Sequence, residues 1–307
     1  MDKKKDSLLP TIGVIVATLL WSTSFISMKL ALRAYHPMTM IFGRMAIASL
    51  VFLLFSKKLR QCRYHKGDWK YLLLMALCEP CFYFVFESYA MLYTTASQAG
   101  MVSSLMPLLV AFGSTLLLRE RLGPTTIPGL LIAISGIGLI SFQGVATESA
   151  PNPLWGNGLE FIAMGFAAGY TILGRFLGRR YSAFVLSASQ MFIGTLFFLP
   201  MLFLPSTQLP TTFALVPTLS IFYLGAFVSF GAYSLFNYGL QNIPASQASV
   251  FINLIPVFSV FFAWLILEES LTRFQSVGML IVLCGVSIST WNPRRRQLRL
   301  RSSHSPV

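Results

Sequence analysis

Long apolar segments run along almost the whole sequence, and they decide what this chain can fold into. The hydrocarbon core of a bilayer is about 30 Å thick, and a helix needs about 20 apolar residues to cross it. Because that core offers no water, each crossing segment must pair its own backbone groups, as a helix does. The sequence therefore predicts an all-α integral membrane protein with ten transmembrane helices. The ten segments are 11–32, 38–55, 69–92, 96–118, 125–142, 154–177, 182–204, 213–240, 245–267 and 274–291.

The composition agrees with a lipid environment. Hydrophobic residues make up 55% of the chain and charged residues only 11%, against roughly 25% charged residues in a soluble fold. The net charge of +13 comes from short clusters between apolar segments, with no basic stripe interleaved with aromatic residues, so no nucleic-acid partner is expected. The first segment is too long for the core of a signal peptide and is expected to remain as an anchor.

The positions of Lys and Arg predict the orientation. Cytoplasmic loops of membrane proteins carry an excess of these residues. With the N-terminus inside, the outer connectors hold only Arg33 and Arg273, and Lys29 and Arg44 lie within spans; all the other Lys and Arg residues fall in inner connectors or tails. We therefore expect a multi-pass protein of the inner (plasma) membrane with both termini in the cytoplasm.

The chain also resembles itself at an offset of 149 residues. Chemically distinctive residues match at this offset: Ala96-Ser97-Gln98-Ala99 with Ala245-Ser246-Gln247-Ala248, Pro107 with Pro256, Glu120 with Glu269, Gly129 with Gly278, and Gly136 with Gly285. We expect two repeats, residues 1–146 and 147–307, with five helices each. Since five is odd, the second repeat must cross the bilayer in the opposite sense. Inverted repeats of this kind are typical of secondary transporters, with substrate bound at the midplane between the halves.

These features carry a family resemblance. The ten spans, the five-plus-five repeat, the first-helix segment Trp21-Ser22-Thr23-Ser24-Phe25, the segment from SQA to Pro in each half, and Arg119-Glu120-Arg121-Leu122 before spaced glycines resemble the drug/metabolite transporter superfamily, EamA-like branch. The resemblance covers nearly the whole chain and implies export of a small metabolite without ATP through a central cavity. The family often has Gly after the Trp, where Ser22 stands here.

Glu79 is the leading candidate for a functional residue. It lies about ten residues into its helix, roughly 15 Å along it, which places it near the midplane. Pro80 follows, and a proline inside a helix frees a backbone carbonyl and kinks the helix. Since a charged group inside the membrane is costly, Glu79 is hypothesised to bind a substrate ammonium group or to couple transport to protons. The alternative is a protonated structural residue bonded to a neighbouring helix.

Glu87 and Arg44 form a second candidate pair. Glu87 lies two turns beyond Glu79, with Tyr83 between them, and Arg44 lies at a similar depth in the second segment. Pairing would lower the cost of burying both charges. The interpretations are a structural ion pair, and an outer gate or a contact for a substrate carboxylate.

Further polar and aromatic residues could line the cavity. Pro107 and Pro256 are expected to kink their helices at equivalent depths and to act as hinges with Pro80. The candidate lining residues are Trp21, Tyr83, Gln98, Ser103, Ser104, Tyr170, Tyr233, Asn237, Tyr238, Gln247, Ser249, Asn253 and Trp264. The alternative is that they only join helices through hydrogen bonds. Lys29 and Glu160 are expected to reach the span ends, and Glu120 and Glu269 to cap the helices that follow them.

The predicted function is a secondary-active exporter of a small polar or amphipathic metabolite, such as an amino acid, driven by its own gradient or by protons. No HExxH, GxSxG or Walker A motif is present, so an enzyme is not expected and no cofactor is predicted. Cys78 and Cys81 lack a second ligand pair and are interpreted as packing residues, so no metal site is predicted. A channel or facilitator without ion coupling is the alternative. The oligomeric state stays open.

Overall fold

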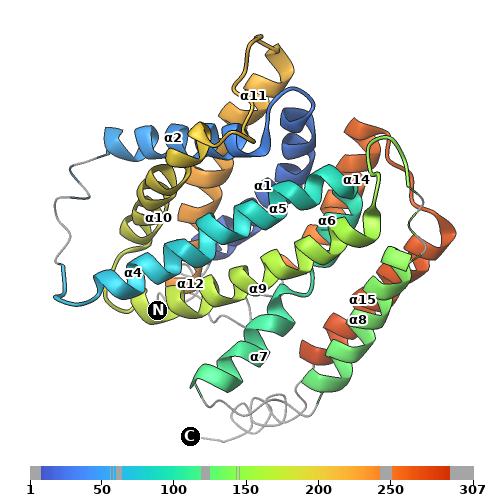
Figure 1. Ribbon diagram of the computed structural model, residues 1–307. Helices are drawn as coiled ribbons and strands as arrows, with labels where there is room; N and C mark the ends of the chain where they lie inside the picture. The colour runs from blue at the N-terminus through green and yellow to red at the C-terminus, as the bar shows by residue number, and fades with distance from the viewer. Residues whose placement is uncertain are drawn as a thin grey trace, which may run out of the picture.

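The computed structural model describes residues 8–55, 57, 59, 64–118, 125–142, 144, 146–242 and 251–290. Helices form the regular secondary structure of these residues, and the described part contains no β-strand beyond one isolated bridge between Thr147 and Ala150. The predicted all-α fold is therefore confirmed, and Figure 1 shows the helices crossing one another in a single bundle.

The helices follow the apolar segments of the sequence. In the first half they are α1 (Leu8–Leu32), α2 (Pro37–Leu54), α4 (Trp69–Ala76), the π-helix η1 (Leu77–Phe82), α5 (Tyr83–Tyr93), α6 (Ala96–Ser103), α7 (Met106–Leu118) and α8 (Thr126–Phe142). In the second half they are α9 (Pro153–Leu177), α10 (Ala183–Phe198), the 3₁₀-helix η2 (Pro200–Phe203), α11 (Leu215–Tyr223), the π-helix η3 (Leu224–Ala232), α12 (Tyr233–Asn242), α14 (Ile255–Leu267) and α15 (Arg273–Thr290).

Six helical segments of the described chain are long and apolar enough to cross a membrane. They are Leu8–Leu32, Pro37–Leu54, Trp69–Tyr93, Ala96–Gly113, Ala183–Phe203 and Leu215–Asn242. Three further apolar helices are shorter: Thr126–Phe142, Ile255–Leu267 and Arg273–Ile288. The remaining predicted span corresponds to α9, which is 25 residues long and carries Asn157, Glu160 and Arg175 among its apolar residues.

Two helices break where kinks were expected. A turn at Ser104 and Leu105 separates α6 from α7, and a turn at Asn253 and Leu254 precedes α14. Pro107 and Pro256 then fall in the first turn of the helix that follows, where proline costs no internal hydrogen bond. The two turns are 149 residues apart, and η1 and the middle of η3 are related by the same offset.

Helices α8 and α15 pack through their glycines. They lie side by side at one edge of the bundle (Figure 1). A Cβ atom on Gly136 would stand 2.7 Å from the carbonyl oxygen of Gly278, and one on Gly285 would stand 2.7 Å from that of Gly129. Small residues at such contacts let two helix backbones approach closely inside a membrane. The helices therefore run antiparallel, because the earlier glycine of each faces the later glycine of the other.

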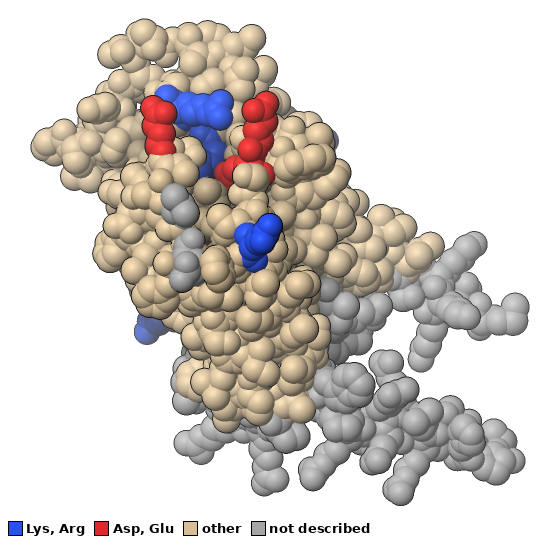
Figure 2. Space-filling model, turned by 90° about the vertical axis from the view of Figure 1, so that its right-hand side faces the viewer, with Lys and Arg blue, Asp and Glu red and all other residues tan. Residues whose placement is uncertain are grey.

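The outer surface of the bundle is apolar. Leu54, Phe142, Leu196, Phe203 and Phe213 each expose more than two-thirds of their surface. On the face that Figure 2 shows, the described side chains are mostly uncharged, and the charged ones lie mainly toward one end. An exposed apolar surface this extensive would drive association in water, and it suits the hydrocarbon of a bilayer.

The glycine contact generates a stability prediction. Gly136→Ala should lower the free energy of unfolding by about 1–3 kcal/mol, because the added methyl group overpacks a backbone contact. Gly138→Ala is the matched control, since no atom lies within 4 Å of a Cβ there. Thermal unfolding of the purified protein in detergent measures both. Equal unfolding temperatures for the two variants would contradict the close contact.

Candidate functional site

A cavity opens between elements from both halves of the sequence. It contains about 510 Å³ of empty space, counting the part open to the outside. Its polar and aromatic walls come from α1, α2, η1, α5, α6, α9 and α12. The residues that line it are Trp21, Ser24, Phe25, Arg44, Glu79, Tyr83, Phe84, Glu87, Ser103, Met106, Met164, Ala167, Tyr170, Tyr233 and Ile255.

Glu79 enters the cavity from a break in its helix. Its backbone is extended, with φ −146° and ψ 119°, inside the π-helical segment that also holds Pro80. The break exposes the Glu79 carbonyl oxygen, which accepts a hydrogen bond of 2.7 Å from Gln190 Nε2 on α10. The Glu79 carboxylate accepts a hydrogen bond from the hydroxyl of Tyr233 on α12. The second half of the chain thus supplies partners for both the freed backbone and the carboxyl group.

Arg44 and Glu87 share the cavity but do not form the expected ion pair. The two described side chains have no nitrogen and oxygen within 4 Å of each other. Instead, Arg44 Nε donates to Ser229 Oγ at 2.6 Å, and its guanidinium lies 4.0 Å from the centre of the Phe84 ring. Glu87 accepts from the Tyr83 hydroxyl at 2.6 Å. The sequence could not indicate Ser229, which reaches Arg44 only through tertiary packing.

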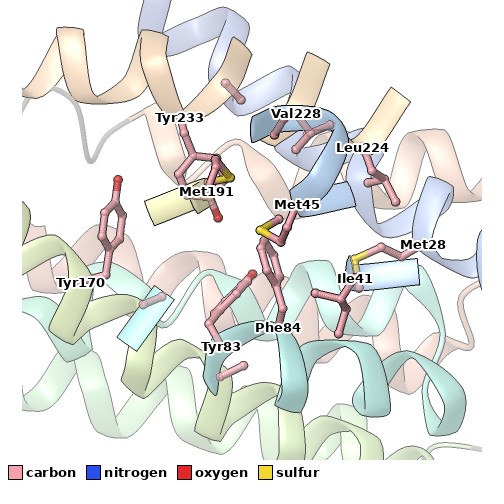
Figure 3. Packing of buried hydrophobic residues seen from close by; sticks show 14 of the residues in the cluster. Met28, Ile41, Met45, Tyr83, Phe84, Tyr170, Met191, Leu224, Val228 and Tyr233 are labelled. Atoms are coloured by element: carbon pink, nitrogen blue, oxygen red, sulfur yellow. The ribbon is translucent and has the colours of Figure 1, made fainter. Parts of the chain in front are cut away.

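Aromatic rings form much of the remaining wall. Trp21 packs edge-on against Tyr233, with ring centres 5.6 Å apart, and Tyr170 lies 6.2 Å from Tyr233. Figure 3 shows Tyr83 and Tyr233 pointing toward one another from opposite sides. The Tyr170 hydroxyl donates to Asn237 Oδ1 at 3.0 Å. Aromatic faces beside carboxyl groups favour cationic ligands.

Glu160 departs from its expected position. It was expected to reach the end of its span, but it is 0% exposed, and neither carboxyl oxygen accepts a hydrogen bond from a described residue. Asn157, one turn earlier on α9, is also buried. A polar pair at this spacing on one helix face was the available signal that Glu160 points inward.

The other candidates divide between the cavity and its surroundings. Ser103 lines the cavity. Gln98 lies outside it, where its side-chain oxygen accepts from Asn157 Nδ2 at 2.8 Å. Tyr238 is 38% exposed, and neither it nor Asn253 lines the cavity. Gln247 and Ser249 lie outside the described residues. Within the described part, no three His, Cys, Asp or Glu side chains are grouped to hold a metal ion.

Glu269 joins the two halves instead of capping the helix that follows it. Its carboxylate accepts from the backbone nitrogens of Ala96 and Ser97, each at 2.9 Å, and from Ser97 Oγ at 2.7 Å. It therefore caps α6, a helix of the first half, because a carboxylate is stabilised at a helix N-terminus. Lys29 donates to the carbonyl oxygen of Ser149 at 2.5 Å and does not simply reach into solvent.

Comparison with known proteins places this chain in a family. The sequence profile of the EamA-like transporter family matches residues 8–142 and again residues 154–291. The chain belongs to the EamA-like transporter family.

The relatives of this EamA-like protein are described as transporters. An "Uncharacterized transporter" of Archaeoglobus fulgidus is 27% identical over 89% of this chain and 94% of its own length. "Uncharacterized transporter YoaV" of Bacillus subtilis is 21% identical over 94% of this chain and 98% of its own. A solved crystal structure covers 96% of this chain and 99% of its own with a TM-score of 0.67 and 19% identity, which shows a shared fold. The protein is therefore a membrane transporter of the EamA-like family.

The partner of Glu79 in this EamA-like transporter can be tested directly. Tyr233→Phe should lower the free energy of unfolding by about 1–3 kcal/mol, because it leaves a buried carboxyl group without its donor. Tyr238→Phe, at a half-exposed site on the same helix, should leave stability unchanged. Chemical unfolding in detergent compares the two, and a Tyr233→Phe variant as stable as the parent would exclude the Glu79 contact.

Proposed function

We propose that the protein is a secondary-active transporter that exports a small polar or amphipathic metabolite, such as an amino acid, by alternating access. One observation carries the proposal: residues from both halves of the chain surround one cavity that is lined by carboxyl, guanidinium and aromatic groups. Buried ionisable groups in membrane helices commonly mark a transport pathway. The driving force is the gradient of the metabolite itself or of protons.

The proposal includes ten transmembrane helices in two inverted repeats, residues 1–146 and 147–307. The reciprocal glycine contacts of α8 and α15 support it, because equivalent residues exchange places across the interface, as a twofold axis requires. The equal spacing of the helix breaks and π-helical segments supports it too. So do the two successive matches of one family profile. We propose the inner membrane as its location, with both termini in the cytoplasm.

Glu79 is the proposed contact for a positively charged group of the substrate. Its carboxyl group lines the cavity, and Trp21, Tyr83, Tyr170 and Tyr233 surround it. A carboxylate attracts an ammonium group, and aromatic faces add a favourable interaction of about 0.5–2 kcal/mol with a cation. Arg44, which also lines the cavity, offers hydrogen-bond donors for a carboxylate. The cavity therefore has groups of both charges with which to bind a zwitterion.

Metabolite profiling tests the transport function. Cells that overproduce the protein should accumulate one metabolite in the medium, and Glu79→Gln should abolish that accumulation while expression stays equal, because the amide cannot pair with an ammonium group. Glu148→Gln, at an exposed glutamate, is the control and should export normally. Unchanged export by the Glu79→Gln variant would refute the proposed contact, and non-saturable flux in proteoliposomes would favour a channel.

Alternating access predicts opposite effects for Glu269 and its sequence equivalent Glu120. Glu269→Gln weakens a cap that joins the halves, so the outward-open state should gain population. Glu120 lies outside the described residues, and Glu120→Gln should favour the inward-open state by the symmetry of the repeat. The test uses an otherwise cysteine-free protein in membrane vesicles, with Ser103→Cys as the reporter in the cavity. An impermeant thiol reagent is added from one side or the other. The side from which Cys is labelled faster shows which open state each variant favours. If both variants were labelled faster from the same side, the proposed opposite effects of Glu269 and Glu120 would be wrong.

A further inference from the structure

Helices α5 and α9 run antiparallel and place Glu87 opposite Glu160. The start of α9 meets the end of α5, where Asn152 N donates to the carbonyl oxygen of Tyr93 at 3.2 Å. Further along, Gly169 of α9 packs against Cys78. Glu160 lies between the two contacts on α9, and Glu87 lies between them on the facing chain. The two contacts place both buried carboxyl groups at about the same level of the packing between α5 and α9.

Three of the four oxygens of this carboxyl pair have no hydrogen-bond partner among the described residues. They are Glu87 Oε2 and both oxygens of Glu160, and the two side chains are 2% and 0% exposed. The neighbouring polar groups are satisfied: Asn157, one turn from Glu160, donates to Gln98 and Ser141 and accepts from Thr94. At this level of α9, the open hydrogen-bonding capacity therefore lies on the carboxyl groups and not on Asn157.

The charges around the pair do not balance if every carboxyl group is ionised. Glu79, Glu87 and Glu160 are buried together with Arg44, and Arg44 forms no ion pair within 4 Å of a described carboxylate. The Tyr83 hydroxyl donates to Glu87, whereas Tyr170 and Tyr233 lie beside Glu79. Lys29 of α1, which packs on α5, donates to the carbonyl oxygen of Ser149. The helices α6, α7 and α8 also pack on α9, and their described residues include no titratable one. Lys70 and Tyr71 of α4 lie beyond Cys78 and are exposed.

We propose that Glu87 and Glu160 form a proton-binding pair, in which Glu160 carries the proton. An unpaired charge in this interior costs several kcal/mol, so a carboxyl group takes up a proton instead. Protonation removes the charge and changes one acceptor oxygen into a donor, which can satisfy an open oxygen of Glu87. No cofactor or metal is needed, because the ligand is a proton from water.

The pair is distinct from Glu79 but linked to the same cavity. Glu87 lines the cavity and Glu160 does not. A cation that enters the cavity stabilises a negative charge on Glu87, and the pair then holds its proton less tightly and releases it to water. Substrate and proton would thus compete, which couples their movements; this role rests on the proposed function, whereas proton binding does not.

Infrared spectroscopy of the purified protein in detergent tests the pair without a transport substrate. At neutral pH and without sodium, the protein should show a carbonyl band of a protonated carboxyl group that Glu160→Gln removes. Glu87→Gln should shift this band, because it changes the partner of the proton. Glu148→Gln should leave the band intact, since that glutamate is exposed. Glu160→Asp keeps the carboxyl group and should retain a displaced band.

The proposal fails if the spectrum of Glu160→Gln shows no loss of a protonated-carboxyl band, or if sodium removes the band from the parent protein, since the site would then bind that ion. Should Glu160→Gln fail to fold, the absence of a displaced band in Glu160→Asp would overturn the proposal equally. Because no flux is measured, loss of the band is independent of the export experiment. A band without export refutes the carrier, and export without the band refutes the pair.

Discussion

The absence of water in the bilayer core is the constraint on which the rest of the structure depends. A helix satisfies its own backbone there, and any break must be satisfied by another part of the protein. The break at Glu79 shows the consequence, because Gln190 binds the freed carbonyl oxygen and Tyr233 binds the carboxyl group. Both partners come from the second half of the chain. The irregular segment therefore holds the two halves together at the place where the cavity forms.

The irregular segments of the helices lie at equivalent positions of the two halves of the chain. The turns before Pro107 and Pro256 and the segments η1 and η3 are related by the offset that relates the sequences of the halves. Each break costs backbone hydrogen bonds of its helix. Because the breaks occur in both halves, we attribute the same role to them in each half. Irregular segments carry backbone groups and polar side chains that a continuous apolar helix would hide, and π-helical turns are frequent at functional sites.

The buried charged groups of the cavity each have a separate set of contacts. Glu79 and Arg44 both line the cavity, and each has its own uncharged partner, Tyr233 and Ser229 respectively. Neither charge is neutralised by the other at contact distance, and both remain available to a ligand. Glu87 also lines the cavity, whereas the buried Glu160 does not. In the proposed carrier, a zwitterionic substrate and a proton would meet through Glu87 without sharing a binding site.

The sequence alone determined the solvent, the helical fold and the family, because apolar segments of bilayer length and matched residues at a fixed offset are properties of order along the chain. It also indicated Glu79, Tyr83 and Ser103 as cavity residues. Only the tertiary structure decided the partners. Arg44 pairs with Ser229 instead of Glu87, Glu269 caps α6 instead of the helix after it, and Glu160 turns inward. The partner of a side chain depends on which helix faces meet across the bundle. The spacing of residues along one helix does not specify which neighbouring helix that will be.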